Sequence, residues 1–429
     1  MIRIDLLSRD RQGAVALPIL LPAILSRNRT LAALMVLTAL TVFGRDAVVP
    51  KVGPKPVGPY SPGIMVNGTL YVSGQGMRRP DGSVPTAFDE QARQCLENVK
   101  AIVEAGGLTL EHVVYSQVYL ADMSKEADFE KVWAQYFPKN PPARAMLGVY
   151  RMPTDTKVEV NAVAIKDLSK KKAVGGTVNG IPAAVFAGEK LYVSGVIGKD
   201  LKTGERPADL DAQVQLALDQ MRQTLKAAGM DFRHMVFINP YLTKEMPMEG
   251  MNKVYSKHFE FGNTPARATI FVNGLPGGAN IEFTGVGIKD LKKRRAVRPK
   301  NMPPSPTASP CVWADDTFYC SAKSGFIPGL NGGIWAEDVE NQVRQSMRNL
   351  LDGLEEAGLD FSHVVKSNVY VDNLDEFSKM NAVYGKYFTS APPTRTTVQP
   401  LAPVERSKSS SGHSPKLEEV SIVAVKEKP

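Results

Sequence analysis

An arginine followed by a glutamate at a fixed distance occurs twice in the sequence, in two segments that are otherwise alike. Arg144 is followed by Glu159, 15 positions later (159 − 144). Arg267 is followed by Glu282 at the same separation (282 − 267). An arginine fork can bind a carboxylate through two charge-assisted hydrogen bonds, each worth about 1.5–3 kcal/mol. A nearby glutamate can orient a water molecule and take a proton from it. If two adjacent antiparallel strands carry the pair, it indicates either hydrolysis of a small carboxylate-bearing molecule or a salt bridge across a sheet.

A third arginine opens a similar segment near the end of the chain, but the spacing to its acid is different. After Arg395 comes a serine- and lysine-rich insertion, ERSKSSSGHSPK. The aligned acid is Glu419, 24 positions on (419 − 395). Because of this insertion, we expect the third segment not to supply a working arginine–glutamate pair.

The elements that must position these residues occur three times along the chain. Runs of equal length begin at Gln91, Gln213 and Gln342 and align without a gap. In each run, apolar residues recur at helical spacing and a glycine ends the helix. A hairpin precedes each helix, and in the first hairpin Asn67-Gly68 is a two-residue turn signal. A β-rich run, a second helix and a closing alternating strand follow. The sequence thus predicts α+β units of about 120 residues in the order β-β-β-α-β-α-β.

The repeat divides the chain into residues 48–169, 170–294 and 295–429, the last being the most diverged. The boundaries fall on two basic clusters, at residues 170–172 and 292–295, which supply much of the net charge of +8. No aromatic side chains are interleaved with them to stack on bases. We therefore expect solvated linkers at these places and no nucleic-acid partner.

One histidine stands at the same place in every repeat, just before the middle strand: His112, His234 and His363. Three histidines could indicate a metal site. Each, however, belongs to a different helix-to-strand turn and has no acidic or thiol co-ligand at a metal-binding spacing. We expect these histidines to pack in turns, and we expect no metal.

Several strings in the first repeat are similar to signatures of the Rid/YjgF family of reactive-intermediate (2-iminopropanoate) deaminases. They are GPYSPG, YVSGQ, QARQCLENVKAIVEAGG, NPPAR and KVEVNAVAI, which together cover nearly all of that repeat. The resemblance implies a chorismate-mutase-like α+β unit. Members are usually single-unit chains that form homotrimers with ligand clefts between neighbouring subunits. Three tandem copies are then expected to close into a single-chain pseudo-trimer that is itself a monomer, because covalent linkage raises the effective concentration of the partners.

The resemblance also assigns roles to residues. The family's water-positioning glutamate matches Glu159 and Glu282, which are the expected catalytic residues. Its carboxylate-binding arginine matches Arg144 and Arg267, with Arg395 in the third repeat. The remaining expected substrate-binding residues match its tyrosine, its Ser-Gly pair and its helix asparagine: Tyr60, Ser73, Gly74, Ser194, Gly195, Asn252 and Asn381.

The repeats depart from this pattern in ways that differ between copies. Tyr60 aligns with Ile181 and Ala308. In the third repeat, Ser321 is followed by Ala322 and Lys323 instead of Gly-Gln, and in the first repeat the asparagine position holds Glu130. Because family clefts draw on two subunits, the number of working clefts depends on which repeats face each other, and the sequence leaves this open.

The function implied is hydrolysis of a 2-imino or enamino acid, a small molecule carrying a carboxylate, to a 2-oxo acid and ammonia. No cofactor is expected, because an imine is already electrophilic. Two alternatives remain open: a non-catalytic scaffold that binds carboxylates or proteins, and an endoribonuclease.

The first 47 residues differ from the rest, since basic residues precede short apolar runs such as LAALMVLTALTVF. This outline is typical of a secretory signal, and both runs are short for a membrane span. We expect a signal or an N-terminal anchor and an exported or anchored protein with no other stable membrane contact. If the start codon is over-extended, a cytoplasmic protein is expected instead.

Two of the three cysteines, Cys311 and Cys320, flank the third hairpin. A two-residue turn at Asp315-Asp316 places them opposite each other as a non-hydrogen-bonded pair. Such a pair can form a disulfide or remain two small buried side chains, and both alternatives stay open.

Overall fold

The computed structural model describes residues 44–429 except 202, 301, 330–331, 408–412 and 429. The expected signal or anchor therefore lies largely outside the described residues. The first strand, β1, nevertheless begins at Asp46, inside the segment 1–47. No helix among the described residues has the length and apolar character needed to cross a membrane.

The three repeats have the same architecture, an antiparallel-rich sheet with two helices on one face. The first repeat consists of β1 (Asp46–Val48), β2 (Gly63–Val66), β3 (Thr69–Gln75), α1 (Phe88–Ala105), β4 (Val113–Leu120), α2 (Glu126–Tyr136), β5 (Ala143–Gly148) and β6 (Val158–Ile165). Its strand order is β1-β2-β3-β6-β4-β5, in which only β5 runs parallel to its neighbour, β4. The expected α+β class is confirmed, and the arginine segment adds a strand of its own, β5, to the expected order.

The other repeats follow the same plan. The second consists of β7 (Lys171–Val178), β8 (Ile181–Ala187), β9 (Lys190–Ile197), α3 (Leu210–Ala227), β10 (Met235–Leu242), α4 (Met248–Tyr255), β11 (Ala266–Arg267), β12 (Ile270–Phe271) and β13 (Ile281–Ile288). The third consists of β14 (Arg294–Val297), β15 (Cys311–Ala314), β16 (Thr317–Lys323), β17 (Phe326–Ile327), β18 (Ile334–Trp335), α5 (Val339–Glu356), β19 (Val364–Val371), α6 (Phe377–Tyr384), β20 (Thr394–Val398) and β21 (Glu418–Val425).

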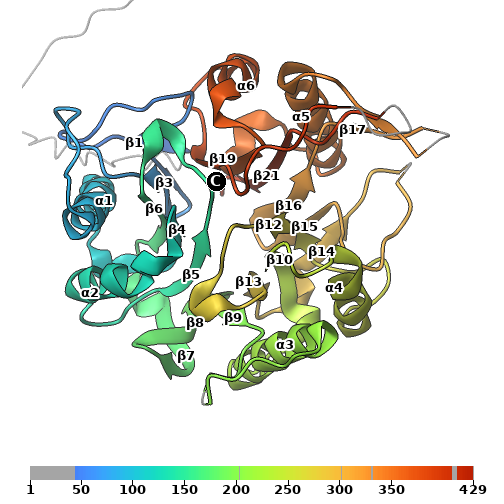
Figure 1. Cartoon of the computed structure of the whole chain (residues 1–429), viewed down its shortest axis with the longest axis horizontal. Coiled ribbons are helices and arrows are strands. Elements are labelled where there is room, and N and C mark those ends of the chain that lie inside the picture. Colours follow the sequence, from blue (N-terminus) through green and yellow to red (C-terminus); the bar gives the residue numbers. More distant parts are fainter. Residues whose placement is uncertain (1–43, 202, 301, 330–331, 408–412, 429) are drawn as a thin grey trace, which may run out of the picture. The chain divides into compact units, whose positions relative to one another are not determined.

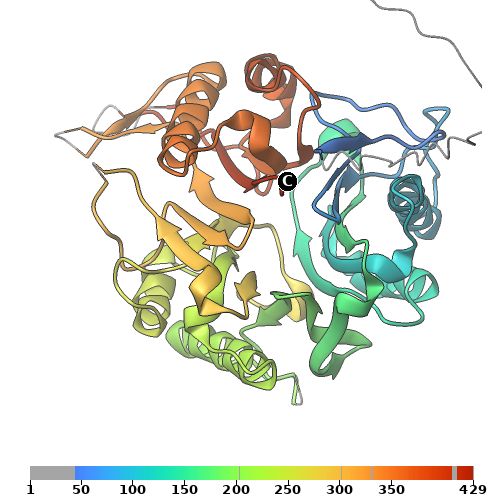
Figure 2. The same cartoon turned by 180° about the vertical axis from the view of Figure 1, so that it is seen from behind.

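The repeats pack with their sheets inward and their helices outward, as the two opposite views show (Figures 1 and 2). Each repeat has its own apolar core between its helices and its sheet. A further core takes residues from all three sheets and includes Tyr71, Tyr192 and Tyr319. The apolar inner faces of the sheets are thus buried against one another, which is the pseudo-trimer expected from the repeats.

The two basic clusters are not linkers, so that part of the expectation was wrong, although four of their side chains are exposed to solvent as expected: Lys170, Lys172, Lys292 and Arg295. Lys171 opens β7 and Arg294 opens β14, the strands that pair with the hairpin of the second and third repeat. Both side chains reach back to the preceding repeat. Lys171 Nζ donates to the Glu111 carbonyl at 2.8 Å, and Arg294 Nε donates to the Met235 carbonyl at 2.9 Å. The clusters join consecutive repeats, because their side chains donate hydrogen bonds to backbone carbonyls of the preceding repeat near the start of its middle strand.

Each of the three histidines ends a short 3₁₀ turn, as expected. Its Nδ1 accepts a hydrogen bond from the backbone N–H three positions earlier, which closes the turn before the middle strand. The bonds are Thr109 to His112 at 3.1 Å, Asp231 to His234 at 3.1 Å and Asp360 to His363 at 3.3 Å.

The third hairpin has the expected register, with Cys311 opposite Cys320. The two residues form a disulfide with their Cα atoms 4.0 Å apart. The bond lies under α5, where a side chain at Gly353 would come within 2.8 Å of Cys311 Sγ. Cys95 in the first repeat is buried and free.

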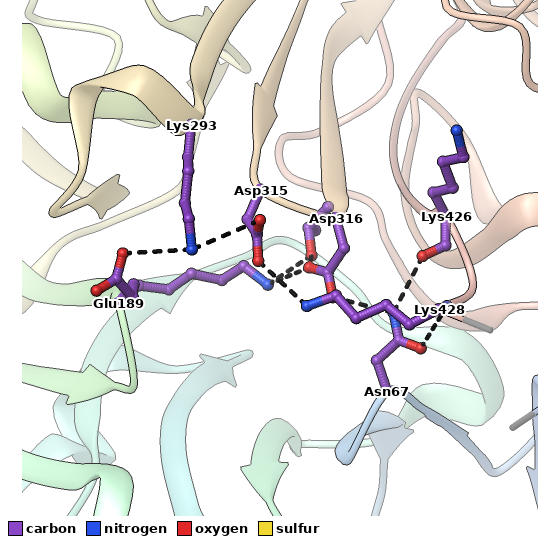
Figure 3. A network of polar contacts seen from close by, with 9 residues as sticks. Asn67, Glu189, Lys293, Asp315, Asp316, Lys426 and Lys428 are labelled. Atoms are coloured by element: carbon purple, nitrogen blue, oxygen red, sulfur yellow. Dashed lines mark hydrogen bonds and ion pairs between the residues drawn. The ribbon is translucent and has the colours of Figure 1, made fainter.

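The hairpin turns of all three repeats meet in one polar network (Figure 3). At its centre lies Asp316, which accepts from Asn67 Nδ2 at 2.9 Å and from Lys190 Nζ at 2.9 Å. Lys428 Nζ, near the end of the chain, lies 3.0 Å from the same carboxylate. A residue of the third repeat is therefore bound directly by residues of the first and the second.

We expect Asp316→Asn to lower the free energy of unfolding at pH 7 by about 1.5–3 kcal/mol, the usual contribution of hydrogen bonds to a charged group. Burial opposes ionisation, but Lys190 and the hydrogen bonds from Lys190, Lys428 and Thr317 hold the pKa of Asp316 well below its usual value of 3.8. A carboxyl group whose pKa is lower in the folded than in the unfolded state stabilises the fold at pH values above its unfolded-state pKa. This stabilisation is lost as the pH falls through its folded-state pKa. Urea unfolding at pH 7 and in steps below pH 4 measures this, with the more exposed Asp315→Asn as control. A difference between wild type and Asp316→Asn that does not shrink in acid would contradict the assignment.

Candidate active site

The arginine and the glutamate of one repeat do not share a pocket. Arg144 lies on β5 and Glu159 on β6, and β4 separates these strands in the sheet. The expectation that adjacent antiparallel strands carry the pair was wrong, because β5 joins the edge of the sheet parallel to β4. Each arginine instead faces the next repeat.

One serine hydroxyl makes the contact between repeats at each of three clefts. It accepts a hydrogen bond from the backbone N–H of the arginine and donates to a carbonyl of its own repeat. The arginine-to-serine bonds are Arg144 to Ser194 at 3.0 Å, Arg267 to Ser321 at 2.7 Å and Arg395 to Ser73 at 2.9 Å. We name the clefts by the repeats that supply arginine and glutamate: cleft 1/2 (Arg144 and Glu282), cleft 2/3 (Arg267 and Glu419) and cleft 3/1 (Arg395 and Glu159).

In cleft 3/1 the arginine is buried and available for a ligand. Arg395 is 3% exposed, and its guanidinium carbon lies 5.4 Å from the ring centre of Tyr60 and 5.1 Å from that of Tyr384. Its Nη1 donates to Asn381 Oδ1 at 2.7 Å. Among the described residues, no carboxylate lies within ion-pairing distance of this guanidinium. A buried cation without a counter-ion favours an anionic ligand.

The glutamate of cleft 3/1 lies against the Ser-Gly pair of the first repeat. A Cβ atom at Gly74 would overlap Glu159 Oε1, so only glycine leaves room for this carboxylate. Burial raises the pKa of Glu159 to about 8, although Arg395 opposes the shift. Arg395, Glu159, Gly74 and Tyr60 line one cavity of about 60 Å³. An acid that titrates near neutral pH beside a carboxylate-binding cation can hold and deprotonate a water molecule.

The mouth of this cavity is formed by the proline-rich segment before β2. Pro50, Pro54 and Pro56 line it, and Arg78 faces them, with its Nη2 donating to the Lys55 carbonyl at 3.1 Å. The Tyr60 hydroxyl accepts a hydrogen bond from the backbone N–H of Val57 at 3.3 Å. The segment is thereby fixed over the ligand space.

In cleft 1/2 the arginine is bound to a carboxylate of the chain itself. Both Nη atoms of Arg144 donate to the carboxylate of Glu130, Nη1 at 3.1 Å, at the position where the other repeats have asparagine. Ile181 replaces the tyrosine. Glu282 lies against Gly195 as Glu159 does against Gly74, and burial raises the pKa of Glu282 to about 8. This cleft retains its acid, but its arginine is already neutralised.

In cleft 2/3 the glutamate is displaced. Ala322 stands where Gly74 stands in the first repeat, so the position carries a methyl group where the first repeat has none. Glu419 instead forms an ion pair with Lys416, at 2.8 Å, in the insertion before β21. Arg267 keeps its asparagine, because Nη1 donates to Asn252 Oδ1 at 2.6 Å. Burial lowers the pKa of Arg267 and the charge of Glu419 opposes that shift, so the cleft keeps both residues, but its acid is paired with Lys416.

The structure therefore brings together the first repeat's Tyr60, Ser73, Gly74 and Glu159 with Arg395 and Asn381 of the third. Ser194 and Gly195 lie with Arg144 and Glu282, and Asn252 lies with Arg267. The third repeat, from which we expected no working pair of its own, supplies the arginine of the most complete cleft. Sequence reasoning did not identify Gln75, Thr397 and Phe377, which also line the cavity. Their only signal was proximity in sequence to assigned residues.

Comparisons with known proteins identify the family of the chain. A family model described as Endoribonuclease L-PSP matches three times, at residues 51–166, 177–288 and 302–403. The chain belongs to this family and contains three copies of its unit, and the resemblance to Rid/YjgF proteins is confirmed.

Individual relatives align with one repeat's length of the chain. A RutC family protein of Saccharolobus solfataricus is 40% identical over 124 residues, which is 28% of this chain and 98% of that protein. The human 2-iminobutanoate/2-iminopropanoate deaminase is 38% identical over 115 residues, 26% of this chain and 84% of the enzyme. Among solved structures, E. coli TdcF with bound serine is 32% identical and has a TM-score of 0.28, with 28% of this chain and 99% of that chain covered.

Proposed function

We propose that the chain hydrolyses 2-imino acids, or their enamine tautomers, to 2-oxo acids and ammonia, and that cleft 3/1 is the catalytic site. The observation that carries the proposal is a buried arginine that forms no ion pair with a described residue, in the same small cavity as a buried glutamate of raised pKa. Relatives named 2-iminobutanoate/2-iminopropanoate deaminase support the same chemistry.

In this mechanism the substrate carboxylate binds the Arg395 guanidinium, which Asn381 and the aromatic rings hold in place. The Gly74 amide orients the imine, and Ser73 positions the arginine by accepting a hydrogen bond from the Arg395 backbone N–H. Glu159 accepts a proton from water, whose oxygen attacks the C=N carbon and forms a carbinolamine. Glu159 passes this proton to the nitrogen, which completes the carbinolamine. The hydroxyl proton then moves through Glu159 to the nitrogen, the C–N bond breaks as the C=O bond forms, and ammonia leaves with a 2-oxo acid as the second product. Water is the only co-reactant.

A direct test is ammonia release from 2-iminopropanoate generated freshly by an amino-acid oxidase, with and without the protein. A non-catalytic carboxylate-binding scaffold remains the alternative, and cleft 2/3 favours it, because Glu419 there is paired with Lys416. A scaffold would be stabilised against thermal unfolding by a 2-oxo acid but would not accelerate ammonia release. That result would overturn the proposal.

The proposal predicts a rising pH dependence. Glu159 must be ionised to take a proton from water, and burial raises its pKa to about 8. We therefore expect kcat/KM to increase from pH 6 and to level off above about pH 8, after correction for the spontaneous reaction. Initial rates across this range measure the profile. Glu282→Gln, in cleft 1/2, should leave the profile in place, whereas Glu159→Gln should remove it. A profile that is flat in wild type would exclude Glu159 as the base.

We also propose that the chain works as a monomer, because its own repeats provide all three sheets of the trimer-like core. The disulfide between Cys311 and Cys320 supports export to an oxidising compartment, which we keep as a proposal.

A further inference from the structure

A second cavity lies where the three sheets meet, apart from the three clefts. Its volume is about 50 Å³, and it is lined by residues of all three repeats. Most are aromatic or amide side chains, among them Tyr71, Tyr192, Gln117 and Asn239. A space of this size holds about three or four water molecules, or one small ion with a water.

Lys366 of β19 is the only lysine, arginine or carboxylate among the described lining residues of this cavity. The corresponding positions of the other repeats hold Tyr115 on β4 and Phe237 on β10. The positions correspond because each of the three residues pairs with a valine of the closing strand of its own repeat. The lysine is thus a feature of the third repeat alone, and neither the clefts nor the family resemblance accounts for it.

The Lys366 ammonium has no partner within the described part of the protein. The residue is 7% exposed, and its Nζ makes no hydrogen bond or ion pair with a described residue. Two side-chain amides in the cavity are also incompletely bonded, since Asn239 Oδ1 and Asn368 Oδ1 have no hydrogen-bond partner there. An unpaired buried ammonium costs several kcal/mol unless a counter-ion or hydrogen bonds compensate it.

We propose that this central cavity binds a small monovalent anion, of the size of chloride or formate, at the Lys366 ammonium. Side-chain amides and tyrosine hydroxyl groups complete its coordination. The bound anion neutralises the buried Lys366 ammonium and joins residues of all three repeats, so it stabilises the closed arrangement.

The test compares thermal unfolding of the full chain in sodium chloride, bromide or formate with unfolding in sodium gluconate at equal ionic strength. Gluconate is too large for the cavity and serves as the reference. We expect the small anions to raise the Tm of wild type and of Phe237→Met, the matched change at the equivalent position. They should not raise the Tm of Lys366→Met. In gluconate, Lys366→Met should itself unfold at a higher temperature than wild type, because an uncompensated buried charge is removed.

Two further measurements need no variant. Burial lowers the pKa of Lys366 to about 8. The anion concentration for half-maximal stabilisation should therefore rise about 30-fold between pH 6.5 and pH 9.5, in proportion to the loss of the protonated form. The facing tyrosines do not interfere, because burial raises the pKa of Tyr71, Tyr115, Tyr192 and Tyr319. Crystals soaked in bromide should show anomalous density beside Lys366 Nζ. An anion effect equal in wild type and Lys366→Met, independent of pH, would overturn the proposal, as would a bromide-soaked crystal without that density.

Discussion

A Gly74→Ala variant is expected to lose about 10²–10⁴-fold in kcat, the usual contribution of a positioned general base. The added methyl group would overlap Glu159 Oε1 and displace the carboxylate from cleft 3/1. Gly74 does not have a positive φ, so alanine fits its backbone, and the Gly74 amide that orients the substrate is kept. The third repeat already carries this change, since Ala322 occupies the same position and Glu419 lies against Lys416. Steady-state ammonia release measures the loss.

Gly195→Ala is the matched control. Its methyl group would overlap Glu282 Oε1 in the same manner, but in cleft 1/2, where Glu130 neutralises the arginine. We expect this variant to keep the wild-type rate and to show a change in Tm similar to that of Gly74→Ala. Equal losses of activity in the two variants would mean that cleft 1/2 also works and that the chain has more than one site.

Arg395→Ala is expected to lower kcat/KM by about 10²–10⁴-fold, because it removes two charge-assisted hydrogen bonds of about 1.5–3 kcal/mol each to the substrate carboxylate. The same variant should lose the stabilisation that a 2-oxo acid gives the wild type in thermal unfolding. Both readouts follow from a single buried guanidinium that has no carboxylate partner among the described residues.

Arg144→Ala and Arg267→Ala remove the arginines of the other two clefts and are expected to keep kcat/KM close to that of wild type. Arg144 is bound by Glu130, and the glutamate of the cleft that contains Arg267, Glu419, is paired with Lys416. If Arg395→Ala retained activity while Arg144→Ala or Arg267→Ala lost it, the catalytic site would have to be moved to another cleft.

Much of the fold could be predicted because its signals are local. Helical spacing after Gln91, Gln213 and Gln342 identified the long helices, and the turn signal at Asn67-Gly68 identified the first hairpin. The same turn geometry placed Cys311 opposite Cys320. These features depend on residues close together in the sequence, so a repeat could be read without knowledge of its neighbours.

The composition of each cleft could not be predicted, because it depends on contacts between residues far apart in the sequence. Arg395 and Ser73 are separated by most of the chain, and only closure of the third repeat onto the first brings them together. The parallel pairing of β5 with β4 could not be predicted either, because the residues of a short strand at a sheet edge do not indicate whether it runs parallel or antiparallel to its neighbour. The basic clusters were misread for a similar reason. The carbonyl groups that accept from Lys171 and Arg294 belong to the preceding repeat.

The division of each cleft between two repeats has a consequence for substitutions. In a trimer of identical chains, a substitution appears in all three clefts at once, so its effect on function is present in every cleft. In one chain with three repeats, Glu130, which stands where the other repeats have asparagine, affects only the cleft that contains Arg144, and Ala322 affects only the cleft that contains Arg267. Two clefts can then change while the third keeps its residues. A single chain is therefore free of the symmetry that identical subunits would impose on its clefts.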